Sequence, residues 1–119
     1  NEARAYDARA TMFHNNDEFE KALDDRNKTI ELDPTNATYY LNRANTKNFM
    51  EMNEEALVDV DTAIGYGMTT SDVYTIRGII LADLNRREEA LSDLSKSIEI
   101  YPRDGNIQKR TSRCTRRAG

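Results

Sequence analysis

Apolar and small residues recur at intervals of three and four positions between residues 71 and 104. This spacing places them on one face of a helix, whereas a half-buried strand would alternate strictly. Asn85, followed by Glu88 three residues later, predicts the start of a second helix, and Pro102 predicts its end. The segment therefore predicts a hairpin of two amphipathic helices, with these apolar and small positions: Val73, Tyr74, Ile76, Gly78, Ile80, Leu81 and Leu84, then Ala90, Leu91, Leu94, Ser97, Ile98 and Ile100.

The same pattern occurs three times along the chain at one constant interval. Pro34 and Pro102 end the first and third copies, and Met68 stands midway between them, at the corresponding place in the second. Because one helical hairpin cannot bury its own apolar face, repeated hairpins are expected to stack on one another. The aligned sets are Tyr6, Tyr40 and Tyr74; Arg9, Arg43 and Arg77; Ala10, Ala44 and Gly78; Ala22, Ala56 and Ala90; Leu23, Leu57 and Leu91; Asp25, Asp59 and Asp93; and Ile30, Ile64 and Ile98.

This unit resembles the tetratricopeptide repeat, which carries an aromatic residue, a small residue, an alanine and a closing proline at set offsets. Three units, 3–36, 37–70 and 71–104, with a tail at 105–119, are expected to form one domain over residues 1–119. The resemblance implies an all-α fold, a right-handed α-α superhelix of three helix-turn-helix hairpins ended by a partial C-terminal capping helix. The chain departs from the family pattern in having arginine instead of leucine just before the small residue of the first helix.

The six helices are expected near residues 4–15, 18–32, 38–50, 54–64, 72–84 and 87–100. Asp17, Asn53 and Asn85 are helix-start residues and are expected to cap the second helix of each hairpin. Gly65 or Gly67 is expected to end the fourth helix in the left-handed region of backbone space.

Composition fits a thin stack of repeats, since hydrophobic residues make up only 38% of the chain. No apolar run approaches the roughly 20 residues that span a bilayer, and no signal-peptide pattern occurs at the start. We therefore expect a soluble, cytoplasmic protein without a membrane span. Cys114 is the single cysteine, which excludes a disulfide within the chain.

Charge is divided unevenly along the chain. Residues 1–104 hold all 21 acidic side chains and have a net charge of −9, whereas residues 105–119 have a net charge of +5. The acidic part opposes binding to nucleic acid, and the basic tail lacks interleaved aromatic residues and any nucleic-acid motif. We predict no nucleic-acid partner and interpret the tail as solubilising, with contact to phosphate or acidic lipid as the alternative.

The arginine and aspartate that recur in every copy predict ion pairs between helices. Two pairings are open: each arginine reaches the aspartate of its own repeat, or that of the preceding repeat, as Arg43 would reach Asp25. A competing interpretation is a row of arginines that binds an anionic partner. The residues concerned are Arg9, Arg43 and Arg77 with Asp25, Asp59 and Asp93.

The resemblance also implies a binding groove lined by the first helix of each repeat, at the second, fifth, ninth, twelfth and thirteenth places. Amide and hydroxyl groups there would bond to a peptide backbone, and Leu41, Phe49 and Ile79 would hold apolar side chains. The alternative is an ordinary surface on which Phe49 and Ile79 contact the neighbouring hairpin. The principal candidates are Asp7, Thr11, Asn15, Leu41, Asn45, Asn48, Phe49, Asp72 and Ile79, together with Asn42, which follows Leu41. The same places also hold Arg4, His14, Thr38, Thr75, Ala82 and Asp83.

Within the family, the best-defined groove grips the acidic C-terminal tails of heat-shock chaperones with two lysines, two asparagines and an arginine. Only Asn42 matches that set, and both lysine places hold aspartates. Because aspartates would repel an acidic tail, the sequence predicts that chaperone tails are unlikely ligands. The five places are occupied by Asp7, Thr11, Asn42, Asp72 and Ile76.

Nothing in the sequence supports catalysis. His14 is the only histidine, and no glycine-rich phosphate loop, HExxH or CxxC spacing occurs. We therefore expect no enzyme activity, no cofactor and no metal, and we predict a non-catalytic protein-protein interaction scaffold that binds a peptide or helix. Two alternatives remain: a structural segment that self-associates through its terminal repeats, and an engineered repeat protein without a native ligand.

Overall fold

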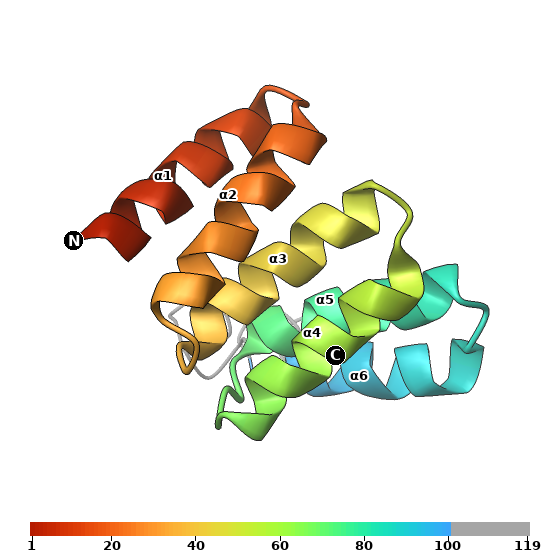
Figure 1. The fold of residues 1–119 in the computed structure, drawn as a ribbon. Helices are drawn as coiled ribbons and strands as arrows, with labels where there is room; N and C mark the ends of the chain where they lie inside the picture. Colours follow the sequence, from red (N-terminus) through yellow and green to blue (C-terminus); the bar gives the residue numbers. More distant parts are fainter. Residues whose placement is uncertain (101–119) are drawn as a thin grey trace, which may run out of the picture.

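The computed structural model describes residues 1–100, which form three helical hairpins stacked in chain order (Figure 1). Successive hairpins meet through α2 against α3 and through α4 against α5. The predicted all-α solenoid is confirmed for this range, and each helix end lies within two residues of its expected place. The expected capping helix in 105–119 lies outside the described residues. The helices are α1 (Glu2–Asn15), α2 (Phe19–Leu32), α3 (Ala37–Phe49), α4 (Asn53–Gly65), α5 (Ser71–Asp83) and α6 (Arg87–Ile100).

The turn inside each hairpin has the same backbone geometry. Asp17, Glu51 and Asn85, which hold the same place in successive repeats, all have positive φ, from 62° to 64°. In the first turn, Glu18 N donates to Phe13 O at 2.8 Å and Asp17 N donates to His14 O at 3.0 Å. This is the Schellman arrangement, which satisfies the last carbonyl groups of a helix, and the other two turns repeat it.

The expectation that Asp17, Asn53 and Asn85 cap the following helix is therefore wrong. Asp17 and Asn85 end the preceding helix in the left-handed region, and Asn53 is already the first residue of α4. Glu18 and Met52 stand at the cap positions of α2 and α4 and make no side-chain capping bond. In each hairpin, the residue with positive φ, which is Asp17, Glu51 or Asn85, ends the first helix and turns the chain. The second helix begins after this turn.

The junction between the second and third hairpins has the expected glycine. Gly67 has a φ of 99°, a region that residues with a Cβ rarely adopt, and its N–H donates to Ile64 O at 2.8 Å. Gly65 is still helical, as the last residue of α4.

Small residues stand where the two helices of each hairpin cross. Ala10 and Ala22 are fully buried in the first hairpin, and Ala44 and Ala56 are fully buried in the second. In the third, a Cβ added to Gly78 would lie 2.7 Å from Leu94 Cγ. The close approach of the helices thus explains the small residue in every copy.

The two interfaces between hairpins differ in polarity. The interface between the second and third hairpins is apolar, with Val60, Val73 and Ile80 fully buried. At the places that correspond to Val60 and Ile80, the interface between the first and second hairpins holds Arg26 and Thr46, both buried. The second joint is therefore packed mainly by apolar side chains, whereas the first combines a smaller apolar cluster with a buried polar network.

Candidate functional site

The recurring arginines form forked ion pairs with aspartates of their own repeats. In every pair, Nε donates to one carboxylate oxygen and Nη2 donates to the other, with distances from 2.7 to 3.0 Å. The structure thus has the first of the two pairings considered, and each pair joins the two helices of one hairpin. The pairs are Arg9 with Asp25, Arg43 with Asp59, and Arg77 with Asp93.

Two of these arginines also reach the preceding hairpin. Arg43 Nη1 donates to Asn27 Oδ1 at 3.0 Å, and Arg77 Nη1 donates to Asp61 Oδ1 at the same distance. One guanidinium therefore ties three helices together. The hydrogen bonds to Asp93 are the main reason that the pKa of Arg77 is raised above its ordinary value. Arg43 and Arg77 thus each donate three hydrogen bonds to two partner residues within the protein, which argues against the interpretation of the arginine row as an anion-binding site.

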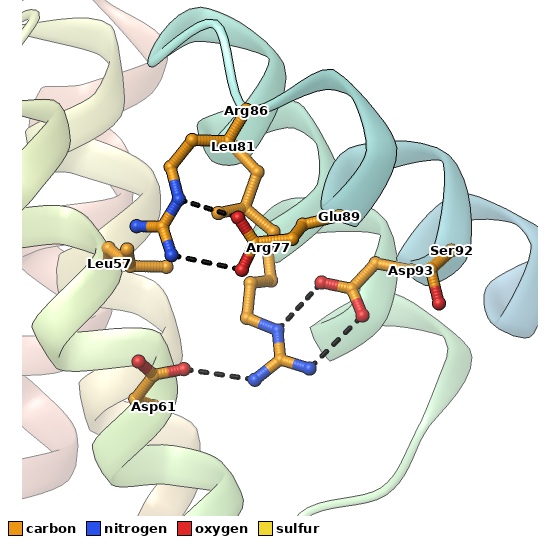
Figure 2. Close-up of a pocket in the computed structure, with 8 residues that line it drawn as sticks. All are labelled: Leu57, Asp61, Arg77, Leu81, Arg86, Glu89, Ser92 and Asp93. Atoms are coloured by element: carbon orange, nitrogen blue, oxygen red, sulfur yellow. Dashed lines mark hydrogen bonds and ion pairs between the residues drawn. The ribbon is translucent and has the colours of Figure 1, made fainter.

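A hollow of about 260 Å³ lies beside Arg77, between α4, α5 and α6. Figure 2 shows the residues that line it. Arg77 points its guanidinium at Asp93 on one side and at Asp61 on the other. At the rim, Arg86 and Glu89 form a second forked pair, at 2.7 and 2.9 Å. The charged side chains that line the hollow bond to one another across the second and third hairpins. The hollow is therefore part of the joint between these hairpins.

We call the surface formed by α1, α3 and α5 at the five places where the groove was expected, together with the adjacent Asn42 on α3, the first-helix face. Most candidates on it are exposed or half-buried, and Phe49 and Ile79 are exposed apolar residues. The expectation for Leu41 is wrong, because its side chain is buried in the core cluster beside Ala44 and Val60 and cannot contact a ligand. The exposed candidates are Thr11, Asn15, Phe49, Asp72 and Ile79, and the half-buried ones are Asp7, Asn42, Asn45 and Asn48.

Asp7 accepts hydrogen bonds from Asn42 and from a buried arginine that was not among the predicted site residues. Arg26 Nη1 donates to Asp7 Oδ1 at 3.2 Å, and Asn42 Nδ2 donates to the same oxygen at 3.3 Å. The Arg26 side chain is only 5% exposed, whereas that of Asp7 is 26% exposed. Burial lowers the pKa of Arg26 from its ordinary value, and the charge of Asp7 acts in the opposite direction. A fixed, buried cation thus lies directly behind the first-helix face.

The network continues to His14, the only histidine of the chain. Arg26 Nε donates to Thr46 Oγ1 at 2.7 Å, and His14 Nδ1 lies 3.1 Å from the same oxygen. Since the hydroxyl oxygen accepts from Arg26, its proton is available for a neutral imidazole nitrogen. Burial first, and then the charge of Arg26, lower the pKa of His14 from 6.5, while Asp17 acts to raise it.

An aromatic cluster covers the other side of the His14 ring. The imidazole meets Phe19 and Phe49 edge-on, with ring centroids 5.1 and 4.8 Å away. Phe49 therefore contacts the neighbouring hairpin, as one interpretation had it, while the residue remains 56% exposed. It is thus also exposed to a ligand on the first-helix face, as the other interpretation required.

Asn48 links the second and third hairpins across the first-helix face. Its Nδ2 donates to Asp83 Oδ2 on α5 at 2.9 Å and to Asn53 Oδ1 on α4 at 2.8 Å. This amide already has structural partners, so Asn45, which lies one turn away on α3, is the better placed of the two to meet a ligand.

Sequence reasoning missed Arg26 and Thr46, although a signal for both was present. At the place of Arg26 the other two copies have Val60 and Leu94, and at the place of Thr46 the third copy has Ile80. A charged or polar residue where sister repeats are apolar indicates a buried polar contact, because an unpartnered charge there would be costly.

Within residues 1–100, no three His, Cys, Asp and Glu side chains come together in a way that could hold a metal ion. Over the same range, no helix has the length and apolar content that a bilayer span requires.

Comparison with known proteins agrees with this architecture. The family model of the tetratricopeptide repeat matches residues 71–104. Over 93 residues, 78% of this chain, the sequence is 29% identical to serine/threonine-protein phosphatase T of Trypanosoma brucei brucei. The chain spans about a fifth of the length of that relative.

Two solved structures show the same arrangement of hairpins. One is the second repeat domain of Spaghetti (RPAP3) bound to the HSP90 peptide SRMEEVD, with a TM-score of 0.79, 25% identity, and coverage of 84% of this chain and 93% of that one. The other is YrrB, a repeat protein with an unusual peptide-binding site, with a TM-score of 0.72, 30% identity, and coverage of 80% and 49%.

The fold and its surface define an all-α repeat solenoid, a class of protein that binds partners along an extended face. Residues 71–104 match the tetratricopeptide repeat, and the whole stack of hairpins is similar in fold to solved tetratricopeptide repeat domains. This fold is typically a non-catalytic interaction scaffold.

Proposed function

We propose that this chain is a non-catalytic scaffold that binds a peptide segment along the first-helix face. The observation that carries the proposal is the exposure of Phe49 and Ile79 on the same face as the amides of Asn15 and Asn45. Apolar anchors flanked by hydrogen-bonding groups are what an extended peptide requires, since side chains need pockets and the backbone needs partners. The bound peptide of one matched domain and the peptide-binding site of the other support this use of the fold.

The HSP90 peptide SRMEEVD is the first candidate ligand to test. The expectation that chaperone tails are unlikely receives no support from the comparisons, because a matched domain with 25% identity holds this peptide. The charges on this chain still weigh against tight binding, because Asp7 and Asp72 stand where lysines would attract an acidic tail. Affinity for this peptide therefore tests whether chaperone tails are ligands. Affinity for peptides from a wider library tests whether the first-helix face binds peptides at all.

The decisive experiment compares two surfaces of the same molecule. Peptides selected from a random display library, together with SRMEEVD, are titrated against the wild type, Ile79→Ser and Asn45→Ala. Val58→Ser is the matched control, because Val58 is an exposed β-branched residue on α4 and belongs to a second helix. Loss of a buried isoleucine contact is worth about 1.5–3 kcal/mol, so Ile79→Ser should weaken binding by about tenfold or more while the control is unchanged.

Binding that is lost in Val58→Ser and kept in the other two variants would place the partner on the second helices. Failure to select any peptide would contradict peptide recognition by this chain.

A second candidate function, stacking on a further copy of the chain, is favoured by the surface of α6. Leu91 and Ile98 are exposed there, at the places where Leu57 and Ile64 of the second hairpin pack against the core between hairpins. A mass that rises with concentration in light scattering, and that returns to the monomer in Leu91→Glu, would support this alternative. A constant mass would contradict it.

A further inference from the structure

Arg26 is a buried cation at the joint between the first and second hairpins. Arg26 is on α2 where the second and third hairpins have Val60 and Leu94, so its guanidinium lies among packed helices. A buried cation is strongly unfavourable unless a counter-charge and hydrogen bonds compensate it. The three forked pairs of the stack bring arginine and aspartate together within one hairpin. Arg26 also meets an aspartate of its own hairpin, Asp7, but through a single hydrogen bond, so other groups must complete its compensation.

The compensation comes from two other helices. Thr46 on α3 accepts from Arg26 Nε at 2.7 Å, which fixes the plane of the guanidinium. Nη1 then donates to Asp7 Oδ1 on α1 at 3.2 Å, and Asn42 Nδ2 on α3 donates to the same oxygen at 3.3 Å. Donors from α2 and α3 thus converge on one carboxylate oxygen that a third helix supplies. Convergence of fixed donors from separate elements on one oxygen is the geometry of an anion-binding site.

The Arg26 side chain is more deeply buried than the Asp7 carboxylate, as a binding group is more deeply buried than the ligand at the mouth of its site. The cation is 5% exposed and held from behind, whereas the carboxylate is 26% exposed and stands at the mouth, on the first-helix face. Removing Asp7 would leave the donors in place, because Arg26 is anchored by Thr46 and Asn42 belongs to α3.

We propose that Arg26 and Asn42 form a carboxylate-binding site and that Asp7 occupies it as an internal ligand. Asp7 thereby determines which group a bound peptide presents at this point of the face. A carboxylate from outside meets donors that are already engaged, and it is repelled by the charge of Asp7. A hydroxyl, amide or ammonium group can instead donate to the exposed part of the Asp7 carboxylate. The statement on peptides rests on the proposed function, whereas the internal ligand does not depend on it.

The first test is chemical rescue of Asp7→Ala by a small carboxylate. Thermal unfolding at neutral pH is compared in sodium acetate and in sodium chloride of equal ionic strength. Asp7→Ala should melt lower than the wild type in chloride, and acetate should restore part of the loss by replacing the missing group. If the variant is unfolded in chloride, the same comparison is made by circular dichroism, as recovery of the helical signal on adding acetate.

Two control variants show whether the effect belongs to the site. Asp72→Ala removes an exposed aspartate from the same face and should show no gain specific to acetate. Asp7→Asn keeps the space filled, so acetate should not enter and should not rescue it. Equal melting temperatures of Asp7→Ala in acetate and chloride would overturn the internal ligand.

The second test asks whether Asp7 controls peptide choice. SRMEEVD with a free terminal carboxylate and the same peptide with an amidated end are titrated against the wild type and Asp7→Ala. The proposal expects the free acid to gain about tenfold in affinity in the variant, and the amide to gain little. Rescue by acetate without any gain for the free acid would keep the internal ligand and overturn its role in peptide selection. That result differs from failure of the proposed function, in which neither protein binds any selected peptide.

Discussion

Arg43 holds Asp59 by both of its carboxylate oxygens, at 2.8 Å each, in the middle of the second hairpin. Lys47 Nζ lies 3.1 Å from one of these oxygens, and the Asp59 side chain is only 4% exposed. Asp61, two residues later on α4, is 53% exposed and accepts a single bond from Arg77. Asp59 and Asp61 thus carry the same side chain on the same helix, but they differ in the number of bonded partners and in burial.

The first prediction compares alanine at these two positions. Asp59→Ala strands the largely buried guanidinium of Arg43 and a neighbouring ammonium, so it should lower the free energy of unfolding by about 3–5 kcal/mol. Asp61→Ala removes one bond at the surface and should lower it by less than about 1 kcal/mol. Urea denaturation of both variants gives the two values. Similar losses for the two variants would show that burial does not decide the contribution of these pairs.

The second prediction concerns the close helix crossing at Gly78. Gly78→Ala places a Cβ 2.7 Å from Leu94 Cγ and 3.3 Å from the carbonyl oxygen of Ala90. Overpacking of this kind costs about 1–3 kcal/mol, of which better helix propensity returns about 0.5–1 kcal/mol. We expect a net loss of stability in urea denaturation, although alanine stands at this place in both other repeats.

The same contact predicts a specific rescue. The second hairpin combines Ala44 with Val60 at these two places, so Leu94→Val should make room for the new methyl group. The double variant Gly78→Ala, Leu94→Val should therefore lose less stability than the sum of the single losses. Strict additivity would mean that Leu94 is not the residue that resists the alanine.

The third prediction concerns the turn of the second hairpin. Glu51 has a φ of 62°, a region that disfavours most residues with a Cβ but tolerates asparagine and aspartate, which the other turns contain. Glu51→Asn should raise the free energy of unfolding by about 0.5–1 kcal/mol. Glu54→Asn, inside α4, is the matched control and should lower it slightly, because asparagine is the poorer helix former. A loss of stability in Glu51→Asn would contradict strain at this turn.

The fourth prediction is a pH dependence that comes from His14. Burial and the charge of Arg26 hold the pKa of His14 below 6.5 in the folded protein, so the unfolded chain takes up this proton first as pH falls. Between the unfolded and folded pKa values the unfolded state binds more protons, and stability therefore falls as pH drops through about 6.5. Above that pH the imidazole is neutral in both states and its contribution is fully present.

His14→Gln is the test of this assignment, because glutamine can bond to Thr46 but does not titrate. The urea midpoint of the wild type should fall between about pH 7.5 and 5.5, and that of the variant should fall less. An imidazole pKa above 6.5 in a proton NMR titration of the folded protein would contradict the prediction directly.

Much of the fold could be predicted because a repeat places equivalent residues in equivalent surroundings. The spacing of Tyr40, Ala44 and Ala56, seen again in Tyr74, Gly78 and Ala90, was enough to predict hairpins, their order and their small crossing residues. The turns were placed correctly but explained wrongly, since Asp17 and Asn85 serve equally well as helix caps and as left-handed residues. Only backbone angles separate these two uses.

The candidate face could be predicted less well. The burial and the contacts of a residue at the edge of a helix face depend on the helices packed beside it. Leu41 and Asp7 hold the same place in successive repeats, yet one is buried in the core and the other meets a buried arginine. Arg9, Arg43 and Arg77 could each have reached either of two aspartates, and sequence spacing alone left both pairings open.

The sequence by itself determined that this protein is a stack of three helical hairpins, since the period of its apolar residues admits few other ways to bury them. Only the tertiary structure decided which polar groups meet: Arg43 with Asp59 and Arg26 with Asp7 inside a hairpin, and Asn42 with Asp7 between hairpins. The physical reason is that apolar burial depends on which face of a helix a residue occupies, which periodicity reveals. A hydrogen bond depends on distances of a few ångströms between atoms of different helices, and the packing of those helices sets them.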